Sequence, residues 1–285
     1  MTPGYGVAMN PSDPPVRQRY TQIPEAPAPT SLWRNAFAPV LAAGWALFKF
    51  GGPLLKFFPV FLKTGGTMLL SIGAYALIYG WRFAVGFVLL IFVHEAGHLV
   101  AARLCGIPVG APVFIPFLGA SIALKEAPKN AWIEAVVGIG GPLFGTVGGV
   151  GCLIAGFLLQ SPLMYALASA TFFLQLFNLM PIIPLDGGRV VGAISPWLWI
   201  VGLCILVPFI LMSLSGPGLF VLIIVAASLP RVWRSFRDRN DPEVRRYFEA
   251  KPWQRVLVAA SYFGLVGFIG VAWLVSHALM GQLSA

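Results

Sequence analysis

Long apolar stretches separated by short polar segments make up most of the chain after residue 64. A helix needs about 20 mostly apolar residues to cross the hydrocarbon core of a bilayer, and fewer where the bilayer is thin. Stretches of this kind cover 65–80, 83–104, 131–159, 162–180, 196–214, 217–229 and 256–279. The sixth stretch is short and follows a Gly-Pro-Gly sequence that can simply bend one long element. The pattern therefore predicts six or seven transmembrane helices.

Residues 105–130 have a different pattern, in which glycines and prolines interrupt short apolar runs. The interruptions are Gly106, Pro108, Gly110, Pro112, Pro116 and Gly119. Because these residues prevent a continuous helix, the apolar runs between them predict strands. Strands cannot expose unpaired backbone groups to lipid, so this segment must pair with itself or pack against helices. The predicted fold is an all-α polytopic membrane protein with a short strand-like, membrane-associated segment.

The N-terminal part of the chain contains two further segments. Residues 1–34 are rich in proline and poor in large apolar side chains, which predicts a disordered cytoplasmic tail. No apolar core follows a basic start, so no signal peptide is expected. Residues 35–63 are apolar, and Lys49, Lys56 and Lys63 recur on one side of a helix. This spacing favours an amphipathic segment at the membrane surface, with a broken spanning helix as the alternative.

Composition and charge support a membrane protein and give its orientation. Hydrophobic residues make up 58% of the chain and charged residues only 10%, against about 25% charged residues in soluble domains. With the N-terminus in the cytoplasm and seven alternating spans, Arg82 is the one basic residue outside, and the basic loop 230–255 is cytoplasmic. The net charge of +9 thus reports topology, and nucleic-acid binding is not expected. We expect a multi-pass protein of a bacterial plasma membrane.

A possible metal site lies in the second apolar stretch, in the sequence His94-Glu95-Ala96-Gly97-His98. Histidines four residues apart lie on one helix face and can bind one metal ion, and Glu95 is close enough to reach a water on that ion. An ionised carboxylate within a span costs about 2.5–3.5 kcal/mol, so its presence points to a function. A purely structural histidine pair is the alternative.

A catalytic zinc ion usually has three protein ligands and an open fourth position. His277 is expected near the outer end of the last helix, on the opposite side of the membrane from His98. Glu126 and Glu134 flank the start of a helix, where acidic residues complement the helix dipole. Asp186 remains, in a segment whose prolines and glycines break the helix at membrane depth and can turn a carboxylate inward. We predict a metal site formed by both histidines of the motif and this aspartate.

These two motifs together resemble those of the site-2 protease family of intramembrane zinc metalloproteases. The resemblance rests on HExxH in one helix and on the later Asn-x-x-Pro-x-x-Pro-Leu-Asp-Gly-Gly segment, and it covers about residues 64–215. It implies one Zn²⁺ per chain bound by His94, His98 and Asp186, with Glu95 as the base that activates water. Asn178 matches the asparagine that the family places near the substrate or the intermediate.

One part of the family pattern is missing from this chain. Many relatives carry Gly-Pro-x-x-Asn in the helix after the strand region, whereas this chain ends the same pattern with Gly145. A polar role of that asparagine is therefore absent or moved to another residue. The glycine-rich run over 138–151 contains two overlapping GxxxG spacings and predicts close helix packing, with substrate contact as the alternative.

The resemblance implies a metalloendopeptidase that hydrolyses peptide bonds in or near transmembrane segments, close to the cytoplasmic face, as in regulated intramembrane proteolysis. Its partners would be membrane-protein substrates and the lipid bilayer. A substrate helix must unwind before its peptide bond can be attacked, and residues 109–124 could offer a backbone edge for the unwound strand. Proline at Val113 or Ile115 would then lower cleavage. PDZ-like or CBS-like insertions are not visible, and residues 216–285 add C-terminal transmembrane helices.

Two other functions fit parts of this pattern. One is a different membrane metallopeptidase whose third ligand is a glutamate. The other is a metal-binding membrane scaffold that does not cleave, although a binding site does not need a base such as Glu95. The sequence does not identify the substrate.

Overall fold

The computed structural model describes residue 45 and residues 63–117, 119–212 and 217–282. All elements below lie within Pro59–Ala285. The disordered tail expected at 1–34 lies outside the described residues, as does nearly all of the surface segment expected at 35–63.

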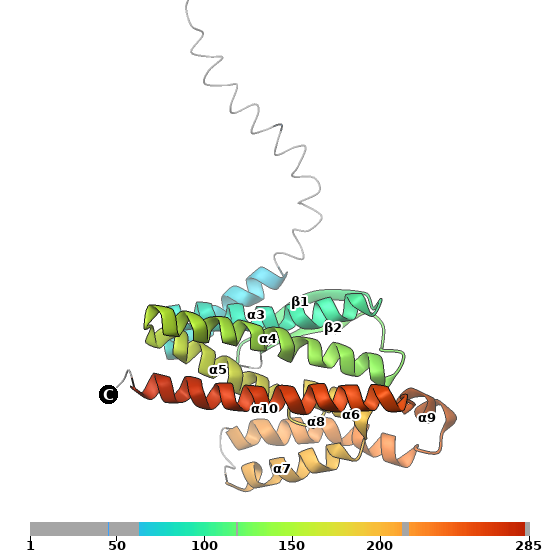
Figure 1. The fold of residues 1–285 in the computed structure, drawn as a ribbon. Helices are drawn as coiled ribbons and strands as arrows, with labels where there is room; N and C mark the ends of the chain where they lie inside the picture. Colours follow the sequence, from blue (N-terminus) through green and yellow to red (C-terminus); the bar gives the residue numbers. More distant parts are fainter. Residues whose placement is uncertain (1–44, 46–62, 118, 213–216, 283–285) are drawn as a thin grey trace, which may run out of the picture. The chain divides into compact units, whose positions relative to one another are not determined.

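This part of the chain is mostly helical (Figure 1). A helix over 63–79 precedes α3, and the chain turns between them at Gly80, which has a φ of 80°. The elements that follow are α3 Trp81–Leu104, β1 Val109–Ile115, β2 Gly119–Leu124, α4 Ala131–Leu159, α5 Pro162–Asn178, α6 Asp186–Ile194, α7 Leu198–Met212, α8 Pro217–Arg237, α9 Pro242–Phe248 and α10 Pro252–Gln282. The predicted strand-like segment is confirmed, and the predicted helix break lies between α5 and α6.

Three helices are long and apolar enough to cross a membrane, namely α3, α4 and α10. Their most apolar windows have mean hydropathies of 1.9, 1.9 and 2.0. Two other stretches expected to span form helices of 17 and 15 residues, α5 and α7. The expected count of six or seven spans is therefore not confirmed among the described residues.

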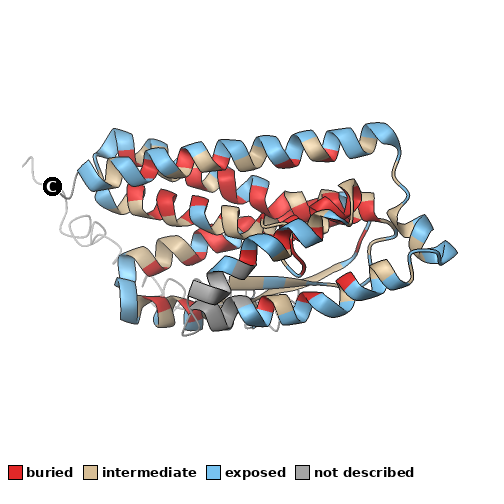
Figure 2. Cartoon of the chain, turned by 90° about the horizontal axis from the view of Figure 1, so that it is seen from below, coloured by how far each residue is buried: buried red, intermediate tan, exposed pale blue. Residues whose placement is uncertain are grey.

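Buried residues lie on the faces that the helices turn toward each other, and exposed residues lie on the outward faces (Figure 2). Many of the exposed residues are large and apolar. Side chains of α4 and α10 that are more than half exposed include Val147, Phe157, Leu158, Val256, Val271 and Leu274. An apolar surface of this extent is costly in water but matches the hydrocarbon of a bilayer.

Glycines bring α4 directly against α3. A Cβ atom at Gly97 would overlap the backbone of Gly140, and a Cβ atom at Gly140 would lie 2.7 Å from the Cβ of Ala101. Two helix backbones approach this closely only where small residues face each other. The packing role expected for the glycine-rich run is confirmed at this contact.

The strands form an antiparallel hairpin whose register places Val113 opposite Ser121 and Ile115 opposite Gly119. Phe114 is 2% exposed and packs with buried residues of α3 and of the helix over 63–79. One face of the hairpin is therefore packed against the helices. Non-helical backbone at membrane depth needs to be covered by protein in this way.

Two threonines of the helix over 63–79 bind the outer edge of β1. Thr64 Oγ1 donates to the carbonyl of Pro112 at 2.9 Å, and the backbone N–H of Phe114 donates to Thr67 Oγ1 at 3.2 Å. Because successive residues direct their backbone groups to opposite edges of a strand, residues 112 and 114 face away from β2. The free backbone edge expected over 109–124 is therefore occupied at this part of β1.

The first turn of α4 is tied to the C-terminal part of the chain. Arg231 of α8 donates to both carboxylate oxygens of Glu134, at 2.8 and 2.7 Å, and Tyr247 of α9 donates its hydroxyl to the same carboxylate at 2.5 Å. Burial and the adjacent carboxylate raise the pKa of Tyr247 well above its usual range, so the hydroxyl remains a donor. Glu134 was expected only to complement the helix dipole, but it also binds two residues of the C-terminal part of the chain.

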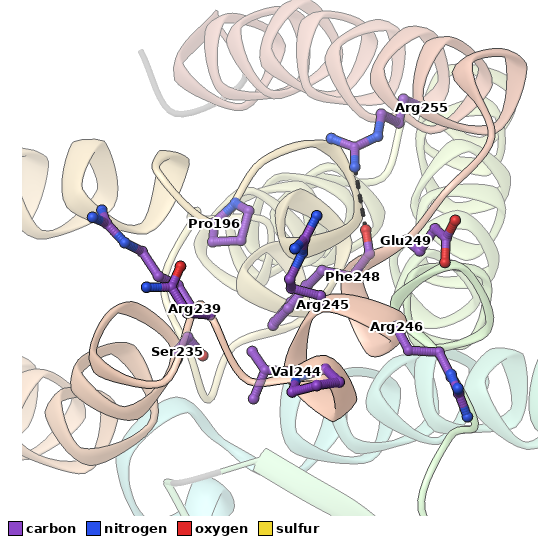
Figure 3. A pocket seen from close by; sticks show the side chains of 11 residues that line it. Pro196, Ser235, Arg239, Val244, Arg245, Arg246, Phe248, Glu249 and Arg255 are labelled. Atoms are coloured by element: carbon purple, nitrogen blue, oxygen red, sulfur yellow. Dashed lines mark hydrogen bonds between the residues drawn. The ribbon is translucent and has the colours of Figure 1, made fainter.

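The basic loop expected at 230–255 folds as the end of α8, α9 and the start of α10. With Pro196 these segments line an open pocket of about 590 Å³, whose lining includes Arg239, Arg245, Arg246 and Arg255 (Figure 3). Arg255 donates to the carbonyls of Ile194 at 2.9 Å and Phe248 at 3.2 Å. These bonds fasten the end of α6 to the start of α10.

We expect Glu134→Gln to lower the free energy of unfolding by about 1–2 kcal/mol, because it leaves Arg231 without a charged partner. The loss is smaller than for a fully buried pair, since the Arg231 side chain is 40% exposed. Unfolding in detergent would measure it. Asp238→Asn is the matched control, because Asp238 faces Arg237 at 3.8 Å in an exposed pair and should change stability little. Equal effects of both substitutions would contradict the assignment.

Candidate metal centre

The two histidines of the HExxH sequence lie on the inner face of α3. His94 and His98 are 4% and 8% exposed, and their Nε2 atoms are 3.1 Å apart. The four-residue spacing of the motif places the rings one turn apart on the same helix face, as the sequence predicted, and they meet edge to face at an angle of 81°. Two ring nitrogens at this distance are suited to share one ion.

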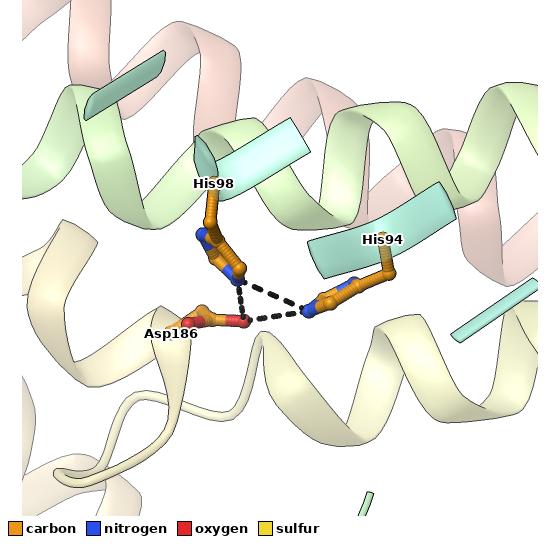
Figure 4. A group of neighbouring side chains, drawn as sticks. All are labelled: His94, His98 and Asp186. Atoms are coloured by element: carbon orange, nitrogen blue, oxygen red, sulfur yellow. Dashed lines mark hydrogen bonds and ion pairs between the residues drawn. The ribbon is translucent and has the colours of Figure 1, made fainter. Parts of the chain in front are cut away.

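Asp186 completes the group from the first residue of α6. Its Oδ2 lies 3.3 Å from His94 Nε2 and 3.1 Å from His98 Nε2 (Figure 4). His94, His98 and Asp186 form the one group of three His, Cys, Asp or Glu side chains able to hold a metal ion among the residues that the structure describes. The structure thus brings together the three residues predicted as ligands.

The outer nitrogens of both rings have acceptors as partners. Nδ1 of His94 lies 2.6 Å from Oε1 of Gln175, and Nδ1 of His98 lies 2.8 Å from the carbonyl of Val137. A carbonyl oxygen can only accept, so each Nδ1 is a donor, which leaves Nε2 as the atom of each ring that would bind a metal. Metal-binding histidines are held in this way, and the donor set of two imidazoles and one carboxylate suits zinc. The side chains therefore fit a divalent metal ion.

Gly187 and Gly188 allow the turn that positions the aspartate. A Cβ atom at Gly187 would overlap the carbonyl of Leu179, and one at Gly188 would overlap the backbone of Ile182. Only residues without a side chain fit where the start of α6 crosses the preceding turn so closely. This packing explains why the two glycines follow the aspartate directly.

Two hydrogen bonds from distant helices hold the same turn. The fully buried Trp199 of α7 donates its indole N–H to the carbonyl of Gly188 at 2.7 Å. Tyr262 of α10 donates its hydroxyl to the carbonyl of Leu179 at 2.5 Å. Both bonds link a backbone carbonyl near Asp186 to a distant helix, and so they stabilise the turn that carries this residue.

The sequence also pointed to Glu95 and Asn178, and it rejected three other residues as ligands. Glu95 is 5% exposed and next to His94, while Asn178 is half-buried at the last position of α5. The rejected ligands are not part of the group: Glu126 is exposed, and the ring of His277 stacks on Trp273 with centroids 5.7 Å apart. Glu134 binds Arg231 and Tyr247, as described above.

Gln175, the side chain that binds His94, was not predicted from the sequence. The available signal was a lone amide in an otherwise apolar part of α5, because a polar side chain at such a position needs a partner. The carbonyl of Val137 could not be found in this way, since every residue has a backbone carbonyl.

Comparison with known proteins agrees with this site. Residues 82–171, from the start of α3 into α5, match the sequence profile of Peptidase family M50. A zinc metalloprotease of Methanocaldococcus jannaschii is 34% identical over 119 residues, which are 39% of this chain and 34% of that protein. Rip3 of Mycobacterium tuberculosis, provisionally named a zinc metalloprotease, is 32% identical over 142 residues, 45% of this chain and 35% of that protein. The matches thus span about a third of the length of these relatives.

We expect Gly141→Ala to weaken binding of a divalent metal at least tenfold, because the new methyl group would overlap the ring of His98 and displace it. Titration with a metal indicator would measure the affinity. Gly151→Ala is the control, since it lies on the same helix with open space at its Cβ position. Unchanged affinity in Gly141→Ala would show that the ring does not need its present position.

The family resemblance seen in the two motifs is confirmed by the profile match and by the relatives. The matched residues contain the HExxH sequence of α3 and the glycines of α4 that pack against it. Asp186 lies beyond the matched residues and joins the group through the fold. Residues 82–171 of this chain, which include both histidines of the metal centre, are similar to Peptidase family M50.

Proposed function

We propose that this protein is a zinc-dependent metalloendopeptidase that cleaves membrane proteins in or near their transmembrane segments. The observation that carries the proposal is the convergence of His94, His98 and Asp186 next to the buried Glu95. The names of the relatives support zinc and proteolysis, and the apolar helices support substrates within a membrane.

We assign a separate task to each residue of the site. The two histidines and Asp186 would hold Zn²⁺, which supplies Lewis-acid activation of a water molecule and of the scissile carbonyl. Glu95 takes the proton from the attacking water and delivers it to the amine of the leaving peptide. The negative charge of Asp186 offsets part of the charge of the cation, which lowers the cost of burying it. Asn178 at the end of α5 is proposed to contact the substrate or the intermediate.

We infer the orientation of the site from Arg103, since Arg82 at the other end of α3 is the one basic residue that the expected topology leaves outside. The site lies in the second half of this helix, and the last turn carries Arg103. Since basic residues flank spans on the cytoplasmic side, cleavage is proposed close to the cytoplasmic face. This matches a multi-pass protein of a bacterial plasma membrane with its N-terminus in the cytoplasm and its protease core over 64–215.

The hairpin is proposed to bind the unwound substrate along β2. Thr64 and Thr67 already occupy the outer edge of β1, so an added strand has better access to the other edge of the sheet. Ala120 and Ile122 lie opposite Phe114 and Pro112 in the register, and so their backbone groups face away from β1.

We expect Ile122→Pro to lower cleavage several-fold without loss of zinc, because proline removes one outward donor and leaves the hairpin bonds intact. Val113→Pro and Ile115→Pro are unsuitable tests, since these residues face β2 and the substitutions would disrupt the hairpin itself. Cleavage of a model transmembrane substrate and zinc content would both be measured. If Ile122→Pro cleaves the substrate at the wild-type rate, the substrate does not bind along β2.

The function is tested by metal content and cleavage in wild type, Glu95→Gln and Asp186→Ala. We expect one zinc per chain in wild type and Glu95→Gln, with cleavage only by wild type, because Glu95 moves the proton and does not bind the ion. Asp186→Ala should lose both zinc and cleavage.

Three results would contradict parts of this proposal. Zinc retained in Asp186→Ala would mean that another residue, such as a glutamate, is the third ligand. Cleavage by Glu95→Gln at the wild-type rate would remove Glu95 as the base. Stoichiometric zinc without cleavage of any transmembrane substrate would favour a metal-binding scaffold.

A further inference from the structure

Gln175 is a fully buried amide in the helix that faces the metal centre. Its exposed fraction is 0%, and it lies in α5 one turn before Asn178. A buried amide costs free energy unless its polar atoms are paired, and an apolar residue of similar size would avoid that cost. The presence of glutamine at this position therefore calls for a reason other than packing.

One half of the amide has a partner in the metal centre. Oε1 lies 2.6 Å from Nδ1 of His94, which is the shortest hydrogen bond of either histidine. An acceptor at this place holds the proton on Nδ1 and leaves Nε2 free for a metal. With the amide turned round, its N–H would force the proton of the ring onto Nε2, which would block the metal.

The other half of the amide does not contribute to stability. Nε2 of Gln175 has no hydrogen-bond partner within the part of the chain that the structure describes. A buried donor without a partner is unfavourable, and a methionine or leucine at this position would bury no such donor. The contact between Oε1 and His94 is therefore the reason we infer for a glutamine at this position.

The neighbouring helix has no side chain where this amide lies. A Cβ atom at Gly145 of α4 would overlap Nε2 and Cδ of Gln175. This is the position at which the chain departs from the Gly-Pro-x-x-Asn pattern. An amide from α5 therefore occupies the space that a side chain from α4 would fill.

We propose that Gln175 is a positioning residue of the metal centre, which fixes the tautomer and ring orientation of His94, and that Gly145 provides the space it needs. The inference rests on the proposed metal site and assigns a residue beyond its three ligands. Gln175 acts on the metal only through His94.

The test compares Gln175→Met, which removes the acceptor at similar volume, with Gln175→Glu, which keeps an acceptor at the same reach. Loss of the outer partner of a metal-binding histidine lowers metal affinity 10- to 100-fold. We expect this loss in Gln175→Met, and affinity within a few-fold of wild type in Gln175→Glu. Zinc dissociation constants of the full chain in detergent would be measured by competition with a chromophoric chelator.

Two further measurements separate positioning from packing. The visible spectrum of the Co²⁺-loaded protein should shift in Gln175→Met and stay close to wild type in Gln175→Glu. The melting temperature of the metal-free protein should change little in Gln175→Met, because the substitution also removes an unpaired donor. Gly145→Ala should match Gln175→Met, since its methyl group displaces the amide, while Gly151→Ala should behave as wild type.

Each unfavourable result has a distinct meaning. Wild-type zinc affinity in Gln175→Met, or equal losses in Gln175→Met and Gln175→Glu, would overturn the role of Gln175. A large fall in melting temperature of metal-free Gln175→Met would assign the residue to packing instead. Absence of zinc binding by the wild-type protein would overturn the proposed function itself, before any variant is compared.

Discussion

The contact between the backbones of α3 and α4 is the constraint on which the rest of the structure depends. Gly97 and Gly140 let the two helices touch, and Gly141 then faces the ring of His98. At this short distance the carbonyl of Val137 can accept from the same ring, and Gly145 leaves room for an amide from α5. A larger residue at any of these glycines would separate the helices that define the position of the histidines.

Among the described residues twelve polar or charged side chains are buried, and five of them lie in or beside the metal centre. In an apolar surrounding each such group needs a partner, so the partners come from whichever element is close enough: α4, α5, α7 or α10. The carboxylate of Glu134 follows the same rule at the other end of α4, where Arg231 and Tyr247 bind it. Polar contacts thus link helices whose remaining contacts are mostly apolar.

The sequence was sufficient for the features that short-range patterns encode. The spacing of His94 and His98, the broken segment before Asp186 and the interrupted runs at 109–124 predicted the histidine face, the third member of the group and the hairpin. Contacts that depend on how helices cross could not be predicted from the sequence. Examples are the contact of Gln175 with His94 and that of Arg231 with Glu134. The number of spans was also uncertain, since hydropathy does not distinguish a short helix packed against others from one that crosses the bilayer.

The bond from Tyr262 to Leu179 has a consequence for the order in which the molecule is made. Asp186 lies on a turn that is braced by a residue of the last helix, 76 positions later in the chain. Both histidines and the aspartate are synthesised and inserted before that helix leaves the ribosome. The metal centre gains its final support only when α10 packs against α5 and α6. Until then, a nascent chain lacks the hydrogen bond from Tyr262 that holds the turn of Asp186. Maturation of the centre is in this way coupled to completion of the polypeptide.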